Sequence, residues 1–199
     1  MNKSLFFEIN KENISISTSE LYKRLCTGRN FDLSLLQKQI ESVKNLISPK
    51  CCYNICDFVF EDGFLDFGFF KAKSKSLARL GENYKKSVFF AITLGFELER
   101  EQTRLSKFSK ADAFLLDAVA SAYAESVCDT AEKTIKEFLG KDYDFSRRFS
   151  PGYSDFSLAH QKDVLSFVDA KANLGITLLD SLLMIPQKSI TAVMFFDKK

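Results

Sequence analysis

The strongest constraint in this sequence is a helical pattern that runs without interruption from residue 110 to residue 139. Ser109 is suited to cap its start, and Gly140 follows its end. At about 1.5 Å per residue such a helix is about 45 Å long, enough to cross a whole domain. The rest of the chain must therefore pack around it. The apolar residues that recur every three or four positions are Leu116, Ala120, Tyr123, Val127, Ala131, Ile135 and Phe138.

Strand signals lie on both sides of this helix. Residues 86–93 are a compact apolar run between turn signals, which predicts a buried central strand. Residues 51–70 are rich in aromatic and β-branched residues and are broken by Glu61-Asp62-Gly63, which predicts two strands joined by a tight turn. The tail predicts a hairpin in which residues 176–185 and 189–196 flank a turn at Pro186.

The remaining segments favour an α/β fold of the α+β type. Few strand–helix–strand units are visible, so we expect a mixed, largely antiparallel sheet with flanking helices. No repeat or linker divides the chain, and we expect a single domain over residues 1–199, with residues 86–199 as its core. Further helices are predicted at 35–47, 76–81, 96–108 and 157–174, a strand or hairpin at 5–16, and a short helix from Thr18 or Ser19 to Leu25.

Composition excludes several classes of function. Lys and Arg number 28 against 26 Asp and Glu, a net charge of +2, and the two signs are mixed along the chain. Nucleic-acid binders usually carry a clustered basic face, so no nucleic-acid partner is expected. No apolar run approaches ~20 residues, so no membrane-spanning helix is expected. An acid at Glu8 interrupts any signal-peptide core, which favours a cytoplasmic location.

No metal site or catalytic residue is predicted. Cys51, Cys52 and Cys56 lack the paired spacing of a zinc site and have no nearby histidine, so buried small apolar residues are the simpler interpretation. Neighbouring cysteines in a strand point to opposite faces, which makes joint ligation awkward. His160 is the only histidine. No nucleophile elbow, P-loop, H-E-x-x-H or dinucleotide-binding glycine motif is present.

The segment after the long helix offers the clearest binding chemistry. Pro151 and Gly152 suit the second and third positions of a type II turn. That turn holds Arg148 close to Tyr153, a pair that suits a ligand with a carboxylate and a flat ring. The alternative is that Arg148 pairs with a local acid such as Asp144 or Asp155 and that Tyr153 is only packed. The residues by themselves leave both possibilities open.

The order of these motifs resembles a known family. Arg148–Tyr153 (RFSPGY), followed by a helix and by residues 175–193 (GITLLDSLLMIPQKSITAV), is similar to the activation domain of cobalamin-dependent methionine synthase, and above all to its free-standing short members. Residues 91–95 (AITLG) and 115–121 (LLDAVAS) fit the same group. The resemblance covers most of the chain, mainly from residue 86 onward.

The resemblance implies a non-Rossmann fold with an S-adenosylmethionine site. Arg148 would hold the ligand carboxylate, Tyr153 would contact the sulfonium or adenosine part, and the backbone of Phe149 and its neighbours would meet the adenine. Ser121 stands where the full-length domain has a ligand-contacting glutamate, and Glu125 lies one turn further along the same helix face. The cofactor-binding residues expected on this basis are Arg148, Phe149, Ser150, Gly152, Tyr153, Asp155, Ser121 and Glu125.

The family's task is reductive reactivation of enzyme-bound cobalamin that has been oxidised to the cob(II)alamin state. An electron donor such as flavodoxin or ferredoxin supplies the electron, and S-adenosylmethionine supplies the methyl group. The resemblance thus implies an accessory protein, inactive without a methionine synthase or other corrinoid protein that carries the cobalamin. The alternative is a non-catalytic docking module that has lost its ligand. An independent methyltransferase acting on a small thiol has no visible base or metal site to support it.

Overall fold

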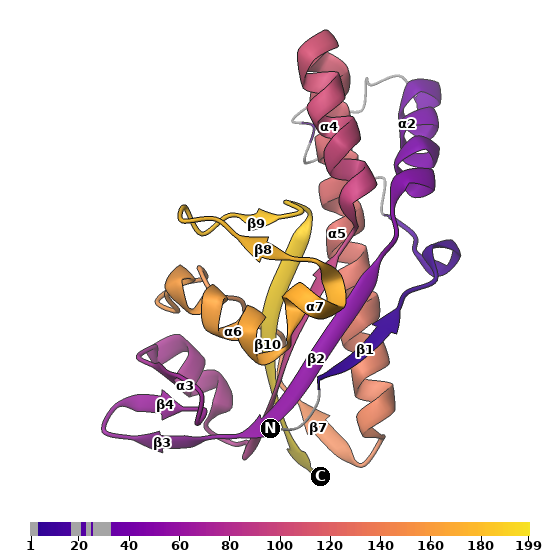
Figure 1. Cartoon of the computed structure of the whole chain (residues 1–199). Helices are drawn as coiled ribbons and strands as arrows, with labels where there is room; N and C mark the ends of the chain where they lie inside the picture. Colours follow the sequence, from indigo (N-terminus) through magenta and orange to yellow (C-terminus); the bar gives the residue numbers. More distant parts are fainter. Residues whose placement is uncertain (1–3, 17–20, 23–24, 26–32) are drawn as a thin grey trace.

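The computed structural model describes residues 4–16, 21–22, 25 and 33–199, and its elements are labelled in Figure 1. Five strands form a central sheet in the order β1-β2-β6-β10-β7, and every neighbouring pair in it is antiparallel. The largely antiparallel α/β architecture expected from the sequence is therefore confirmed. The strands are β1 (Leu5–Glu8), β2 (Lys50–Asp57), β6 (Lys86–Thr93), β7 (Tyr143–Phe145) and β10 (Ser189–Lys198).

Strand β6 is the centre of the sheet, as its apolar sequence predicts. Val88, Phe90 and Ile92 pack into one core cluster, whereas Phe89 and Ala91 pack into a second cluster on the opposite face. Successive strand residues point to opposite faces, so a strand that is covered on both sides must be apolar throughout. This explains why residues 86–93 show no alternation of apolar and polar positions.

Helices cover both faces of the sheet (Figure 1). One core cluster joins the sheet to α2 (Leu33–Leu46), α4 (Phe96–Phe108) and α5 (Lys110–Leu139). The other joins it to α3 (Lys75–Gly81), α6 (Gln161–Phe167) and α7 (Ala170–Leu174). The helices expected at residues 35–47, 76–81 and 96–108 are thus present.

Helix α5 has the length and the start that the sequence indicates. The Ser109 side chain accepts a hydrogen bond from the backbone N–H of Asp112 at 3.3 Å, and Gly140 caps the other end with φ 107°. Ala118, Ala120, Ala122 and Ala124 are buried along its first half, where small side chains let neighbouring elements come close. The helix runs behind the central sheet in Figure 1, and its C-terminal half lies beside β7.

The cysteines in β2 lie on opposite faces of the sheet. Cys51 belongs to one core cluster and Cys52 to the other, and neither side chain is exposed. Burial raises the pKa of the Cys52 thiol to about 12 and raises that of Cys51 as well. Both are neutral core residues near pH 7, in agreement with the interpretation as small apolar residues.

The predicted hairpin at Pro186 is wrong. β9 (Met184–Ile185) pairs with β8 (Thr177–Leu178), while β10 leaves the Pro186 turn to pair with β6 and β7 in the central sheet. Ile190 lies opposite Ile92, in a register that adds β10 to the buried middle of the sheet. Burial of a long apolar strand between two partners outweighs pairing with its chain neighbour.

Three smaller predictions also change. Residues 51–70 give one strand of the central sheet and then a separate hairpin, in which Asp62 and Gly63 both have positive φ, as a tight hairpin turn requires. The helix expected from Ser157 to Gly175 is broken at Asp169, which has a left-handed backbone. Residues 5–16 give β1 and a 3-10 turn, and the helix expected from Thr18 or Ser19 to Leu25 lies largely outside the described residues. The small sheet consists of β3 (Val59–Glu61), β4 (Phe64–Asp66) and β5 (Lys71–Ala72); the 3-10 turns are η1 (Lys11–Asn13) and η2 (Leu158–His160).

Candidate functional site

The segment between β7 and η2 is fastened to β10 by its backbone. Ser146 donates its N–H to the carbonyl of Phe195 at 2.9 Å, and its hydroxyl accepts the Phe195 N–H at 2.9 Å. Phe149 exchanges a pair of backbone hydrogen bonds with Val193, at 2.9 and 2.8 Å. The N–H of Phe149 is therefore engaged with β10. Arg147 and Arg148 lie between these two anchors, which fix their positions beside the sheet.

The turn that follows has the geometry expected of its proline and glycine. Tyr153 donates its N–H to the carbonyl of Ser150 at 3.1 Å, and Gly152 has φ 92°. This is the hydrogen bond and the positive φ of a type II turn with Pro151 at its second position. The Gly152 N–H is also bonded to the Phe156 carbonyl at 2.7 Å, so the turn is held from both sides.

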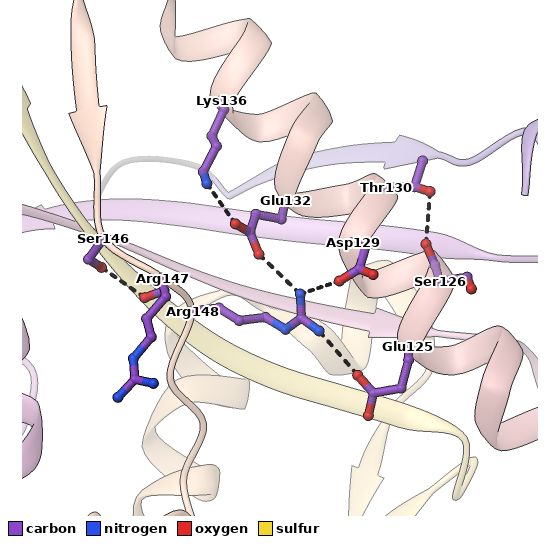
Figure 2. Close-up of polar contacts among 9 residues, drawn as sticks. All are labelled: Glu125, Ser126, Asp129, Thr130, Glu132, Lys136, Ser146, Arg147 and Arg148. Carbon is purple, nitrogen blue, oxygen red and sulfur yellow. Dashed lines mark hydrogen bonds and ion pairs between the residues drawn. The ribbon is translucent and has the colours of Figure 1, made fainter. Parts of the chain in front are cut away.

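Arg148 extends from this segment to one face of α5, where it forms ion pairs with three acidic side chains (Figure 2). Its Nη1 is bonded to Asp129 and to Glu132, the latter at 3.1 Å, and its Nη2 lies 3.1 Å from Oε2 of Glu125. The spacing of four and three residues places the three carboxylates on one side of the helix. We call Glu125, Asp129 and Glu132 the α5 acids.

The alternative in which Arg148 pairs with an acid is therefore correct in kind, but the acids are not Asp144 or Asp155. Only about a quarter (26%) of the Arg148 side chain is exposed. Burial by itself would lower the Arg148 pKa. The pKa is nevertheless raised, by the negative charge that Cys128 carries when it is ionised and by hydrogen bonds to Asp129 and Glu132. Burial raises the pKa of Cys128 to about 12, so the thiol is neutral near pH 7 and the α5 acids provide the stabilisation.

A cavity of about 650 Å³ opens between the turn and α5. Glu125 and Glu132 form its helix wall, and Arg148 lies between them and the turn. Ile190 and Thr191 of β10 line it from the sheet, and residues before η2 close another side. Of the residues expected to bind a cofactor, those that line this cavity are Glu125, Arg148, Phe149, Ser150 and Tyr153.

Two aromatic rings form part of the cavity wall. Tyr153 is 60% exposed, so its ring is accessible to a ligand. Its centroid lies 6.3 Å from that of Phe149, with the two planes tilted by 52°. Aromatic faces attract flat rings and cations. The cavity thus combines carboxylates, guanidinium groups and aromatic surface.

Asp155 and Gly152 support the turn and do not line the cavity. The Asp155 carboxylate accepts hydrogen bonds from the Ser74 hydroxyl at 2.7 Å and from the backbone N–H groups of Lys75 and Ser76 at 2.6 and 3.2 Å. These bonds join the turn to the start of α3. Chiefly the Ser74 hydrogen bond, with further bonds from Ser76 and Lys75, lowers the Asp155 pKa to about 2.

Ser121 lies outside the cavity lining and has another partner. Its hydroxyl is 2.9 Å from Nζ of Lys188, which also pairs with Asp117 at 2.7 Å. Lys188 thereby ties the turn before β10 to α5. Glu125, one helical turn further on, reaches the cavity instead.

Sequence reasoning missed three residues of this site. Asp129 and Glu132 are not singled out by the sequence motifs, although their spacing from Glu125 could have revealed a common acidic face of α5. Arg147 lines the cavity beside Arg148. Within the described part of the chain, no acid forms an ion pair with the Arg147 side chain.

A second cavity of about 720 Å³ lies on the other side of Arg148. It runs between the C-terminal half of α5 and β7, where Lys136, Tyr143 and Phe145 line it, and we call it the α5–β7 groove. Arg148 and Glu132 border both cavities. The ion-pair cluster thus separates the two spaces.

Residues 4–16, 21–22, 25 and 33–199 contain no cluster of three or more His, Cys, Asp or Glu side chains that could hold a metal ion. None of the helices in the same residues has the length and hydropathy of a membrane span.

Comparison with solved structures identifies the fold. The chain is similar to a structure described as the MetH reactivation domain bound to AdoHcy, with a TM-score of 0.72 and 12% sequence identity. The match covers 96% of this chain and 78% of that one. The fold expected from the sequence resemblance is confirmed. No family model and no curated protein matches the sequence.

Proposed function

We propose that this chain binds S-adenosylmethionine in the cavity between the Pro151-Gly152 turn and α5, and that it assists the reactivation of a cobalamin-dependent methionine synthase or related corrinoid methyltransferase. One observation carries the proposal. A turn presenting Tyr153 faces Glu125 and Glu132 across a cavity of about 650 Å³, in a fold similar to a reactivation domain that was solved with AdoHcy. We further propose that residues 1–199 act as one cytoplasmic domain.

The residues around the cavity fit this ligand chemically. S-adenosylmethionine carries a flat adenine, a sulfonium cation and an amino-acid end with an ammonium and a carboxylate. Tyr153 and Phe149 offer ring surface for the adenine, and Glu125 and Glu132 favour the two cationic groups. The volume lies within the range of about 300–1,000 Å³ typical of small-molecule sites.

The chain's own contribution would be binding and orientation. When bound, S-adenosylmethionine supplies the methyl group, while the cobalamin is carried by the partner protein and the electron comes from a donor such as flavodoxin or ferredoxin. A protein that holds one reactant in place lowers the entropic cost of bringing the reactants together. We therefore expect no turnover by the isolated chain.

One observation favours a second candidate function. Arg148, which the resemblance assigns to the ligand carboxylate, already holds three carboxylates. A chain that has lost its ligand could keep this cluster as a purely structural element and still dock on a corrinoid protein. The docking-module alternative thus differs from the main proposal only in ligand binding.

Calorimetric titration with S-adenosylmethionine separates the two candidates. The main proposal predicts saturable binding that Tyr153→Ala weakens by about tenfold, the typical effect of losing one aromatic contact. Phe108→Ala is the matched control, because Phe108 is 78% exposed at the end of α4 and lies outside the cavity lining.

The docking module predicts a different pair of results. Titration would give no heat at millimolar ligand, and a corrinoid methyltransferase would still co-purify with both the unmodified chain and the Tyr153→Ala variant. Binding that Phe108→Ala and Tyr153→Ala weaken equally would place the ligand elsewhere and count against the proposed site.

A further inference from the structure

Two adjacent arginines line the same cavity, but their side chains point in different directions. In Figure 2 the Arg148 guanidinium lies among the α5 acids, whereas the Arg147 side chain runs away from them. Side chains that follow each other in an extended backbone point to opposite sides. The backbone anchors at Ser146 and Phe149 hold this arrangement in place.

Arg148 is poorly suited to bind a further carboxylate. Its two terminal nitrogens already hold Glu125, Asp129 and Glu132. Lys136 also pairs with Glu132 at 2.6 Å, so the cluster holds two cations and three acids. The acids still outnumber the cations by one, and a further carboxylate would be repelled by this wall. A cationic ligand group would be attracted to the same wall.

Arg147 offers the opposite environment. Its side chain is exposed, and within the described residues no carboxylate is paired with it. An arginine presents a planar set of donors that matches a carboxylate with two parallel hydrogen bonds. The cavity is therefore polarised, with negative charge on α5 and positive charge at Arg147.

We infer that Arg147, and not Arg148, binds the carboxylate of the ligand, while the cationic groups of the ligand face Glu125 and Glu132. The ligand class is a sulfonium nucleoside with an amino-acid end, so the inference rests on the proposed function. Arg148 is a positioning residue, because it holds the acids that meet the cationic groups.

Two ligands that differ only in the carboxylate test this assignment. The full chain is titrated with S-adenosylmethionine and with decarboxylated S-adenosylmethionine. The ratio of the two dissociation constants measures how much the carboxylate contributes to binding. Arg147→Ala should weaken S-adenosylmethionine binding by about tenfold or more, as expected for a lost charge-assisted hydrogen bond, and leave the decarboxylated ligand unchanged.

Arg148 variants should behave differently. Arg148→Ala should weaken both ligands by a similar factor, because its effect passes through the α5 acids. Arg148→Lys keeps a cation among them and should restore part of both affinities. Arg100→Ala, which removes an exposed arginine of α4, is the control and should change neither.

The possible outcomes distinguish a failure of this inference from a failure of the proposed function. If neither ligand binds the unmodified chain, the proposed function fails and the inference fails with it. If both ligands bind but Arg147→Ala affects them equally or not at all, the function stands and the inference is wrong. A loss confined to S-adenosylmethionine in Arg148→Ala would assign the carboxylate to Arg148 and also overturn it.

Discussion

Nη2 of Arg148 lies 3.1 Å from Oε2 of Glu125, and this ion pair links the segment after β7 to the middle of α5. The two residues are 23 positions apart in the chain, and together they set the distance between the turn and the helix. The contribution of the Arg148 ion pairs to the free energy of unfolding is therefore the first property to measure.

Arg148→Ala should lower the free energy of unfolding by about 2–4 kcal/mol, because it removes a largely buried guanidinium that pairs with three carboxylates, of which Glu125 and Glu132 are partly buried. Urea denaturation measures the change. Adding Glu125→Gln should recover part of the loss, because it removes one of the like charges and leaves the ion pair between Glu132 and Lys136 intact.

Arg100→Ala is the comparison for a surface pair. Arg100 pairs with Glu97 at 2.7 Å, but both are well exposed, and the expected loss is less than about 1 kcal/mol. Equal losses for Arg100→Ala and Arg148→Ala would contradict a structural role for the cluster.

Asp155 should make the stability of the fold depend on pH in the acid range. Its pKa of about 2 lies below the ordinary value of 3.8, so the folded state favours the ionised carboxylate. The stabilisation is complete above about pH 4 and is lost as the pH falls toward 2. The difference in unfolding free energy between the unmodified chain and Asp155→Asn should therefore shrink from pH 6 to pH 3.

Asp142→Asn provides the control for this experiment, because Asp142 is an exposed turn residue. A pH-independent difference for Asp155→Asn would show that the bonds from Ser74 and Ser76 favour the neutral carboxyl as much as the ionised one.

Gly152 should tolerate a side chain less well than Gly63, a second glycine with positive φ. In Gly152→Ala the new Cβ would meet Leu158 at 3.1 Å with φ 92°, whereas at Gly63, with φ 80°, nothing lies within 4 Å. Both substitutions strain the backbone by about 1–2 kcal/mol, and Gly152→Ala adds a steric contact. Thermal unfolding should show the larger loss at Gly152, and only that variant should bind ligand more weakly.

Much of the fold follows from local patterns in the sequence. The apolar run of β6, the capped ends of α5 and the Pro151-Gly152 turn each depend on neighbouring residues, and each is found where the sequence predicts it. The partners of β10, by contrast, cannot be predicted from local sequence patterns. Its apolar residues suit several partners, and the choice of β6 over β9 is decided by burial against residues about 100 positions away.

The candidate site, too, could be predicted only in part from the sequence. Tyr153 was expected from the turn and Glu125 from the family resemblance, and both line the cavity. The pairing of Arg148 with Asp129 and Glu132 could not be predicted, because an acidic stripe on a helix is compatible with both solvent and an arginine from a distant segment. Only the path of the chain past β10 brings Arg148 to α5.

Ser121→Ala tests how far the family pattern holds at that position. The Ser121 hydroxyl lies against Lys188 and not in the cavity, so affinity for S-adenosylmethionine should change by less than about twofold. The same substitution should cost about 1 kcal/mol of stability, as for one lost hydrogen bond. A large loss of affinity with unchanged stability would place Ser121 in the ligand site.

The most direct test of the central claim is a crystal structure of this chain grown with S-adenosylmethionine. We predict ligand density between the Pro151-Gly152 turn and α5, with the adenine against Tyr153 and the sulfonium facing Glu125 and Glu132. Density confined to the α5–β7 groove, or none at saturating ligand, would contradict the claim.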